Sequence, residues 1–363
     1  MNPFRAVLVA LLLSQFATIA EVSVQPFGKM SDGREVRIFT LKNGHGMLAR
    51  VTEYGATLTE LHVPDAQGHT ANVTLGFDNL EQYLGRHPAF GATIGRFANR
   101  IANARFPLDG RQIQVTRNSG ANHIHGGRQG FGKVVWSGKI TSDNAVTLSY
   151  VAQDGEEGFP GALRVEVRFT LTDKNELRID YTARTTKPTV INLTNHGYYN
   201  LSGKGDILDH ELRLFAAHYT VPGPGLIPTG EIAPVGGSGL DFTQPHQIGE
   251  RIKEFYGETG GYDHNYVIDG KAGELRRAAR IRDPESGRVM EVLTTEPGVQ
   301  LYTLNGAKID ITGTGGVHYG RHAGFALETQ HYPDSPNHPN FPSTTLRPGE
   351  TFRSTTLLRF SSR

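Results

Sequence analysis

The feature that most constrains the fold is a strict alternation of apolar and polar side chains between residues 163 and 181. Every second position is apolar on both sides of a polar turn at residues 173–175, namely Leu163, Val165, Val167, Phe169, Leu171, Leu177, Ile179 and Tyr181. Successive side chains of a strand point to opposite faces of a sheet. This period of two therefore predicts an antiparallel pair of strands with one buried and one solvated face.

Turn signals between further short apolar stretches extend this pattern to the whole chain. Asn43-Gly44 follows the alternating stretch 35–41, and Asp109-Gly110 divides the stretch 106–115. Such pairs tolerate positive φ and are typical of tight hairpins. The 44 glycines and 19 prolines suit many short strands joined by turns. Residues 288–293 and 351–353 also have strand character.

Helical periodicity is confined to two short places. Ile248, Ile252 and Phe255 have the spacing of one amphipathic helix, and residues 79–84 could form another. We therefore expect an all-β sandwich or barrel-like fold with very little helix. The interior of the chain, residues 27–360, has no linker or low-complexity tract. One large domain over residues 21–363 is the simplest organisation.

The first twenty residues differ from the rest. Arg5 precedes an apolar run that ends at Leu13, and small residues lead to Ala20. A basic start, a short apolar core and small residues before a cleavage point are typical of a secretory signal peptide over residues 1–20. The run is shorter than the roughly 20 residues needed to span a bilayer. The sequence thus predicts a periplasmic or secreted protein, with no membrane association after removal of the signal peptide.

Composition excludes several classes of chemistry. The chain has no cysteine, so it has no disulfide, no thiolate metal site and no cysteine nucleophile. The net charge is +1 without a basic run, and a nucleic-acid partner is not expected. No Walker loop, Rossmann glycine pattern or serine elbow is present. What remains is a set of polar side chains suited to proton transfer on a neutral polyol.

The most suggestive stretch is 190–203, where a β-branched entry runs into asparagine, histidine and tyrosine. His196 stands in the middle of it. A histidine can move protons near neutral pH, because its unperturbed pKa is about 6.5. Amides and phenols beside it can hold a polyhydroxylated ligand. The alternative is a structural histidine whose ring nitrogens are satisfied within the protein.

Glu328 is the candidate partner among the carboxylates. It follows the apolar run 325–327, which places it near a strand end with limited access to water. Partial burial raises the pKa of a carboxyl group towards the range of a general base. The alternative is an exposed glutamate on the solvated face of a strand.

Other polar groups leave alternatives open. Arg96 and Arg100 could bind sugar hydroxyls or a carboxylate, or form internal ion pairs. His123 and His125 would share a face of a strand, and their spacing also occurs among metal ligands, but no third ligand is marked. The acidic, glycine-rich stretch 154–161 is either the lip of a cleft or a solvated turn. Further candidates are Asp263, His264 and Gln300.

Taken in order, these stretches resemble the aldose 1-epimerase, or galactose mutarotase, family across roughly residues 27–360. The resemblance is carried by Gly95–Ile101, His125–Gly127, Asp154–Gly161, Leu193–His196, Pro228–Ile232, Tyr262–Asn265, Pro297–Gln300, Leu327–Gln330 and Leu346–Glu350. It implies a large antiparallel β-supersandwich and an enzyme that interconverts the α and β anomers of free aldohexoses such as galactose and glucose.

The resemblance also implies roles for individual residues. Glu328 would be the general base on the C1 hydroxyl, and His196 the general acid on the ring oxygen. The sugar would be bound by Asn99, Arg100, His125, Tyr198, Asp263 and Gln300. No cofactor and no metal are implied, the substrate is a monosaccharide, and the protein is a monomer or a homodimer. We expect the acid and the base to face each other across a cleft about one hexose wide.

Three other functions remain as alternatives. A sugar-phosphate epimerase of the same fold would need further basic side chains at the cleft. A non-catalytic carbohydrate-binding protein would lack His196 or Glu328, and both are present. A glycosidase would use a second carboxylic acid where this chain has a histidine. Gly197, where the family commonly has serine, and His123-Ile124 depart from the family pattern and bear on sugar preference.

Overall fold

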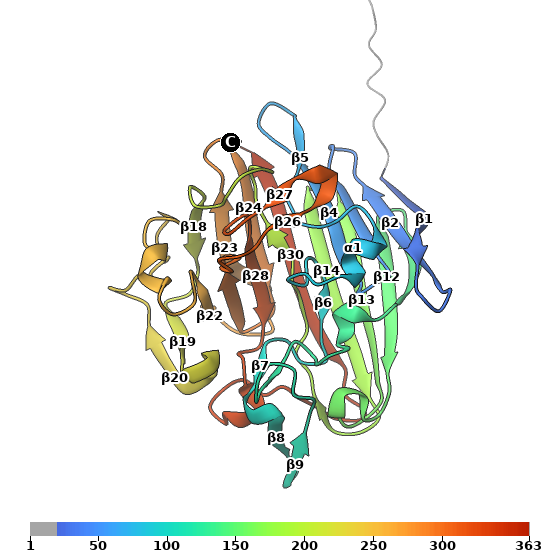
Figure 1. The fold of residues 1–363 in the computed structure, drawn as a ribbon, viewed down its shortest axis with the longest axis vertical. Coiled ribbons are helices and arrows are strands. Elements are labelled where there is room, and N and C mark those ends of the chain that lie inside the picture. Colours follow the sequence, from blue (N-terminus) through green and yellow to red (C-terminus); the bar gives the residue numbers. More distant parts are fainter. Residues whose placement is uncertain (1–19, 363) are drawn as a thin grey trace, which may run out of the picture.

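The computed structural model describes residues 20–362 and confirms the all-β fold (Figure 1). All of the strand pairs in its sheets are antiparallel in this part of the chain. Three larger sheets of nine, six and five strands carry the fold. No helix within residues 20–362 is long and apolar enough to cross a membrane.

The nine-stranded sheet contains the alternating hairpin. Its strands, in spatial order, are β11 (Ser137–Ser142), β12 (Ala145–Ala152), β13 (Leu163–Thr172), β14 (Glu176–Thr185), β30 (Phe352–Ser362), β24 (Arg288–Thr294), β23 (Arg276–Arg282), β18 (Glu211–Leu214) and β21 (His246–Gln247). The five apolar positions of β13 are fully buried, and the residues between them are exposed or half-buried. The predicted hairpin is confirmed.

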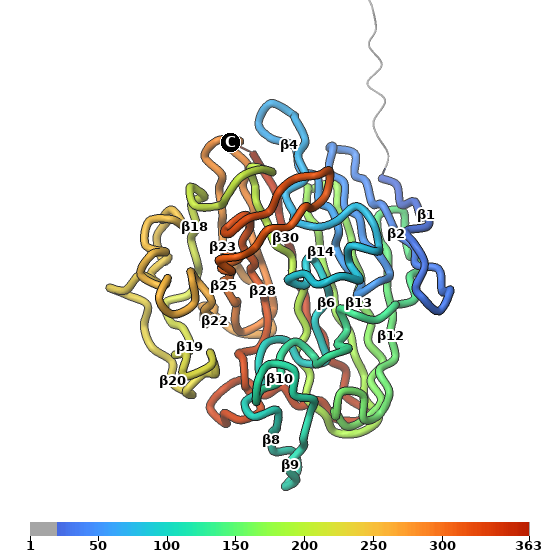
Figure 2. Tube along the Cα trace, in the orientation of Figure 1, coloured from blue at the N-terminus to red at the C-terminus, as the bar shows by residue number. Residues whose placement is uncertain are grey.

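The six-stranded sheet places most of the candidate site. Its order is β17 (Tyr198–Tyr199), β28 (Phe325–Gln330), β25 (Gly298–Tyr302), β22 (Asp263–Val267), β19 (His218–Pro222) and β20 (Pro228–Pro234). Figure 2 traces β28, β25 and β22 as neighbouring segments in the centre of the molecule. The five-stranded sheet is formed by β1 (Glu21–Lys29), β2 (Glu35–Lys42), β3 (Leu48–Thr52), β4 (Thr57–Pro64) and β5 (Thr70–Asn72).

Short elements connect the sheets. The two-stranded pairs are β6 (Thr93–Ile94) with β16 (Thr194–Asn195), β7 (Arg100–Ile101) with β10 (His123–Ile124), β8 (Arg105–Leu108) with β9 (Arg111–Gln114), β15 (Thr189–Val190) with β29 (Thr345–Leu346), and β26 (Ile311–Thr312) with β27 (His318–Tyr319). The α-helix α1 is Leu80–Leu84, capped by the side chain of Asn79. Single 3-10 turns occur at Ala102–Ala104, Phe131–Lys133, Glu156–Gly158, Pro224–Leu226, Ile252–Phe255, Thr314–Gly316 and Ser335–Asn337.

One apolar core holds the three large sheets together. It includes Val51 of β3, Val165 of β13 and Leu301 of β25, all of them fully buried. The nine-stranded sheet therefore shares its apolar side with both other sheets. Since the six-stranded sheet is held on that side, its other face is free to carry polar groups.

The predicted helix over residues 248–255 is wrong. Only Ile252–Phe255 is helical, and it forms a single 3-10 turn. The backbone N–H groups of Ile248 and Gly249 donate to the carbonyl oxygens of His210 and Leu208 instead, at 2.9 and 2.7 Å. The apolar spacing reflects burial of Ile248 and Ile252 in the core rather than a regular helix. The hairpins at Asn43-Gly44 and Asp109-Gly110 are confirmed.

Candidate active site

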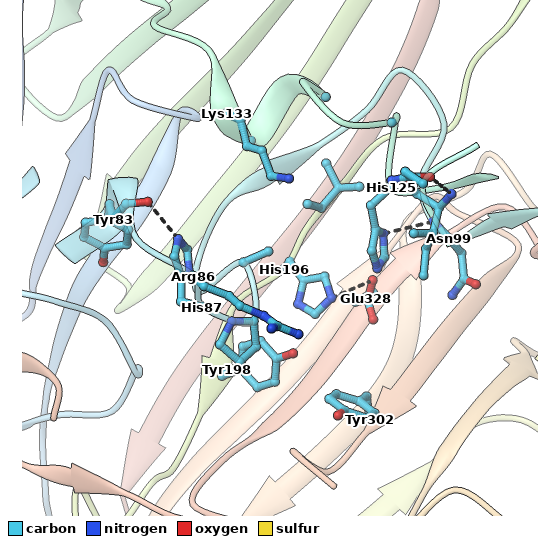
Figure 3. A pocket seen from close by; sticks show the side chains of 18 of the residues that line it. Tyr83, Arg86, His87, Asn99, His125, Lys133, His196, Tyr198, Tyr302 and Glu328 are labelled. Atoms are coloured by element: carbon cyan, nitrogen blue, oxygen red, sulfur yellow. Dashed lines mark hydrogen bonds and ion pairs between the residues drawn. The ribbon is translucent and has the colours of Figure 1, made fainter. Parts of the chain in front are cut away.

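A cavity of about 700 Å³ lies over the six-stranded sheet (Figure 3). Strands β17, β22, β25 and β28 contribute Tyr198, Asp263, Tyr302 and Glu328 to its wall. Segments before β17, at β7 and after β10 add further polar groups. These are His196, Asn99, Arg100 and His125.

The strand period places Glu328 in the cavity. Phe325 and Leu327 of β28 point into the main core, so Glu328 lies on the opposite face. Its carboxyl group is nevertheless buried, with the residue only 2 % exposed. Its Oε2 atom has no hydrogen-bond partner among the described residues. A buried acceptor without a partner is costly, which marks it as a place where a ligand can bind.

His196 is held beside Glu328 by its own backbone. Its N–H donates to the carbonyl of Ala92 at 2.8 Å, and its carbonyl accepts from the N–H of Gly91 at 3.0 Å. The imidazole stacks on the ring of Tyr198, with ring centres 5.0 Å apart. This places His196 Nε2 3.5 Å from Glu328 Oε2. His196 is 5 % exposed, so this pair forms the buried floor of the cavity.

Burial shifts the pKa values of the two groups in opposite directions. Loss of water raises the pKa of Glu328 to about 8, and the negative charge of Asp263 adds to this effect. Burial lowers the pKa of His196 to about 4. At neutral pH the pair therefore holds one proton, which resides on the carboxyl group. Perturbed acid–base groups in a cleft are typical of catalytic sites.

His125 and Asn99 form a second unit above the floor. Both residues have positive φ, 50° and 62°, which turns their side chains out of the β7–β10 pair. The backbone N–H of Asn99 donates to His125 Nδ1 at 3.2 Å, and His125 N–H donates to the carbonyl of Asn99 at 3.1 Å. Burial and the neighbouring His196 and Arg100 hold the pKa of His125 well below its usual value. A neutral ring that accepts at Nδ1 carries its proton on Nε2, so His125 is a hydrogen-bond donor.

The neutral His125 tautomer with its proton on Nε2 disfavours metal binding in the cavity. His125, His196 and Glu328 offer ligand atoms that all lie within 4.8 Å of one another. A metal would need a free lone pair on His125, but Nδ1 already accepts a hydrogen bond and Nε2 carries the proton. The set is therefore better suited to a hydroxylated ligand than to a metal ion.

Arg100, Asp263 and Gln300 form a connected polar group at the side of the floor. An Arg100 Nη2 atom lies 3.7 Å from Asp263 Oδ2, and Gln300 Nε2 donates to Asp263 Oδ1 at 2.6 Å. Gln300 pairs with Glu328 across β25 and β28. Burial raises the pKa of Asp263, and Arg100 opposes this shift. The group can offer both donors and acceptors to hydroxyl groups.

The structure brings the predicted site residues together, with two differences. Seven of the eight line the cavity, whereas Gln300 lies behind Asp263. The acid and the base do not face each other across a hexose-wide cleft, since 3.5 Å leaves no space for a ring between them. In a cyclic hemiacetal the hydroxyl oxygen and the ring oxygen are both bonded to C1. His196 and Glu328 can therefore reach one oxygen each from the same wall of the cavity.

Two further expectations of the sequence are corrected. His123 and His125 do not share a face, because the strand ends at Ile124 and the positive φ of His125 turns the chain. His123 packs against Phe159 instead, at a ring distance of 5.2 Å. Arg96 does not reach the cavity. Its Nη1 atom donates to the carbonyls of Pro160 and Gly161, so it fastens the acidic loop 154–161 to the body of the protein.

Some cavity residues were missed by the sequence reasoning. Tyr302 lies two positions after Gln300 on β25, and the strand period could have identified it. Arg86, His87 and Lys133 also line the cavity. They come from the loop after α1 and from the turn Phe131–Lys133, whose positions depend on packing that no local pattern marks.

Proteins of known activity are similar to this chain over most of its length. Galactose mutarotase from Bos taurus is 46 % identical over 313 residues, which cover 86 % of this chain and 90 % of the relative. Aldose 1-epimerase from Escherichia coli K12 is 35 % identical over 337 residues, covering 91 % and 96 %. The crystal structure of an aldose epimerase homologue from C. elegans superposes with a TM-score of 0.82 at 32 % identity, covering 88 % and 96 % of the two chains.

These relatives contradict the periplasmic or secreted location expected from residues 1–20. Galactose mutarotases of cattle, pig and human match most of this chain, and mammalian cells have no periplasm. Residues 1–19, on which the expectation of a signal peptide depends, lie outside the described residues. No signal peptide is shown, and the predicted location is wrong on this comparison.

The family model for aldose 1-epimerase matches residues 37–359. This span includes all three large sheets except β1, the first residues of β2 and the last residues of β30, and it contains every residue of the cavity floor. Fold, site and sequence similarity therefore agree, and the chain belongs to the aldose 1-epimerase family.

Proposed function

We propose that the cavity interconverts the α and β anomers of free hexoses such as galactose and glucose, with His196 and Glu328 as the acid–base pair. The observation that carries this proposal is the 3.5 Å approach of His196 Nε2 to Glu328 Oε2 on the buried floor. The relatives named galactose mutarotase support galactose as a substrate. Ring opening of a hemiacetal requires one acid and one base, and no cofactor.

In the proposed reaction, the Glu328 carboxylate takes the proton of the C1 hydroxyl while the His196 imidazolium gives a proton to the ring oxygen. The bond between C1 and the ring oxygen breaks, and C1 becomes an aldehyde. Rotation about the C1–C2 bond presents the other face of the carbonyl. Closure returns both protons along the same paths. The pair holds one proton before and after each cycle, so no proton is consumed.

The resting pair needs one adjustment before opening. Burial alone leaves the proton on Glu328, with a pKa of about 8, rather than on His196. The bound sugar brings hydroxyl dipoles to both groups, which favours their charged forms. The proton then moves from Glu328 to His196 over the short distance between them. The same single proton therefore serves the resting and the reacting state.

The remaining groups are assigned by what they can donate. His125 offers its Nε2–H, and Arg100 offers guanidinium N–H groups, to charge that develops near the ring oxygen. The Asp263 carboxylate accepts from sugar hydroxyls, and Gln300 orients it. The Asn99 amide can both donate to and accept from them. Tyr198 supplies a ring face behind His196. The expected oligomeric state, a monomer or a homodimer, stays a prediction.

Polarimetry tests the proposal. Freshly dissolved α-D-galactose, α-D-glucose and further free aldoses are followed with and without the protein in a weakly catalytic buffer. We expect the protein to accelerate the approach to the equilibrium rotation for at least one of the two named hexoses. No acceleration for any free aldose would overturn the proposal. Heat-denatured protein at the same concentration is the control for catalysis by surface groups.

A further inference from the structure

Two cationic side chains line the cavity above the acid–base pair and have no role in the proposed reaction. Arg86 follows α1, and Lys133 ends the turn Phe131–Lys133; both are exposed. Both belong to the cavity wall that also contains His196 and Glu328. Figure 3 shows the Arg86 guanidinium beside Tyr198 and His196, with the Lys133 amino group directed into the cavity from another side.

Neither cation is neutralised within the described residues. Arg86 forms no ion pair or hydrogen bond there, and Lys133 Nζ donates only to the carbonyl of Arg128, at 3.1 Å. Arg100, the third cation of the wall, differs because it lies against Asp263. The upper part of the cavity therefore has an excess of positive charge, and a cleft concentrates the field of such charges on a bound ligand.

The cavity also has more room than a hexose needs. Its volume is about 700 Å³. Cavities of roughly 300–1,000 Å³ commonly hold drug-sized ligands, which are larger than a single sugar ring. A substrate held at the floor therefore leaves space towards Arg86 and Lys133 for a substituent.

The chemistry of the ring indicates where such a substituent lies. This step rests on the proposed function, in which His196 protonates the ring oxygen. That oxygen is bonded to C5, and C5 carries C6, so a group on C6 leaves the ring on the side of His196. In Figure 3 Arg86 lies on the His196 side of the acid–base pair, whereas Asn99 lies on the Glu328 side.

We propose that Arg86 and Lys133 form an anion subsite through which the enzyme accepts aldoses that carry a negative charge at C6. A phosphate ester at C6 and the carboxylate of a hexuronate share this chemistry. Both groups accept hydrogen bonds from a guanidinium and attract an ammonium group. The subsite extends the substrate range of the same acid–base floor.

Exchange spectroscopy by ¹H NMR tests the subsite without pure anomers. The rate of α–β exchange is measured at equilibrium for galactose, galactose 6-phosphate and galacturonate, with the wild type and the double variant Arg86→Gln/Lys133→Gln. The double variant Arg111→Gln/Lys139→Gln, at exposed positions outside the cavity, is the matched control. The quantity compared is kcat/KM for each anionic sugar divided by kcat/KM for galactose.

We expect the wild type to turn over at least one anionic sugar about as efficiently as galactose. The cavity variant should lower that ratio about tenfold, and the control variant should not change it. The difference should shrink at 0.5 M salt, because the cations are exposed and screened. Turnover of only the phosphate or only the uronate identifies the anion. An unchanged ratio, or rejection of both anions by an enzyme active on galactose, overturns the subsite. Inactivity on every free aldose would instead contradict the proposed function.

Discussion

At the scale of single residues, burial decides where the proton of the acid–base pair resides. Glu328 and His196 are both almost fully buried. Burial disfavours the charged form of each group, which raises the pKa of Glu328 and lowers the pKa of His196. The carboxyl group keeps its proton up to a pKa of about 8, and the imidazole takes one only below about 4. Over this wide range, the pair holds the single proton that the reaction needs.

The first prediction is a broad pH profile. Below about pH 4 both groups of the free enzyme are protonated, and above about pH 8 neither is. We therefore expect kcat/KM for galactose to be level between these limits and to fall on both sides, with apparent pKa values that belong to the pair. Initial rates by polarimetry, corrected for the spontaneous reaction at each pH, measure the profile. A fall in kcat/KM centred near pH 6 would show that this buried pair does not control the reaction.

The second prediction concerns the base itself. Glu328→Gln keeps the size of the side chain and its ability to bind a hydroxyl, but it removes the group that takes the proton. We expect kcat to fall at least about a hundredfold, from the usual contribution of a general base. His196→Asn should have a similar effect. Activity near that of the wild type in either variant would show that the role is misassigned.

The stability of Glu328→Gln provides the control for folding. In the wild type, the pKa of Glu328 rises from about 4.3 in the unfolded chain to about 8 in the folded protein. As the pH rises through this window, the unfolded chain ionises first. The free energy of unfolding then falls by at most about 1.4 kcal/mol per pH unit. The variant lacks this loss, so its melting temperature relative to the wild type should rise between pH 5 and pH 8. A variant less stable than the wild type throughout would leave its inactivity attributable to misfolding.

At the scale of elements, one tight loop positions a group of the cavity that the strands alone do not. The loop that carries His125 passes over Gly95, and Gly126 makes the close approach possible. Gly126 has φ +80°, and a Cβ atom there would lie 1.7 Å from the carbonyl oxygen of Gly95. The loop therefore cannot keep its position with any larger residue at 126.

The third prediction uses this close approach. Gly126→Ala should lower the melting temperature by about 5–10 °C, because the backbone must move by more than about 1 Å to relieve the contact. It should also lower kcat/KM at least about tenfold, since His125 moves with the loop. Gly120→Ala is the matched control: its φ is also positive, +59°, but a Cβ atom there meets nothing within 4 Å. Calorimetry and polarimetry measure both variants, and equal effects would show that only the positive φ matters.

The elements also show which features a sequence can predict. The hairpin of β13 and β14 was predictable because every residue obeys one period and Asp173–Asn175 marks its turn. The helix expected at residues 79–84 is α1, and the structure shows Asn79 as its N-cap. The positions of His123 and His125 were not predictable, because one positive φ at His125 replaces a strand by a turn. Arg86 and Lys133 reach the cavity only through the packing of two distant loops, for which the chain has no local signal.

At the scale of the whole molecule, the three sheets contribute differently to the apolar core and to the cavity. The nine-stranded and five-stranded sheets supply much of the shared apolar core. The six-stranded sheet uses that core on one face and carries Asp263, Tyr302 and Glu328 on the other. Short strand pairs such as β6–β16 and β7–β10 then bring His196, Asn99 and Arg100 over this face. Residues that are far apart in the sequence therefore line one cavity, because their segments all lie on the same face of the six-stranded sheet.

In the proposed reaction, His196 and Glu328 open the sugar ring and leave the bond between C1 and its hydroxyl oxygen intact. Galactose labelled with ¹⁸O at C1 tests it most directly. The anomers are interconverted by the enzyme, and the isotope shift of the C1 resonance in ¹³C NMR reports whether the label remains. We expect the label to survive many enzymatic interconversions and to be lost only at the slow rate seen without enzyme. Loss of the label at the rate of anomer exchange would mean that the enzyme breaks the bond between C1 and the hydroxyl oxygen, and would rule out ring opening by this pair.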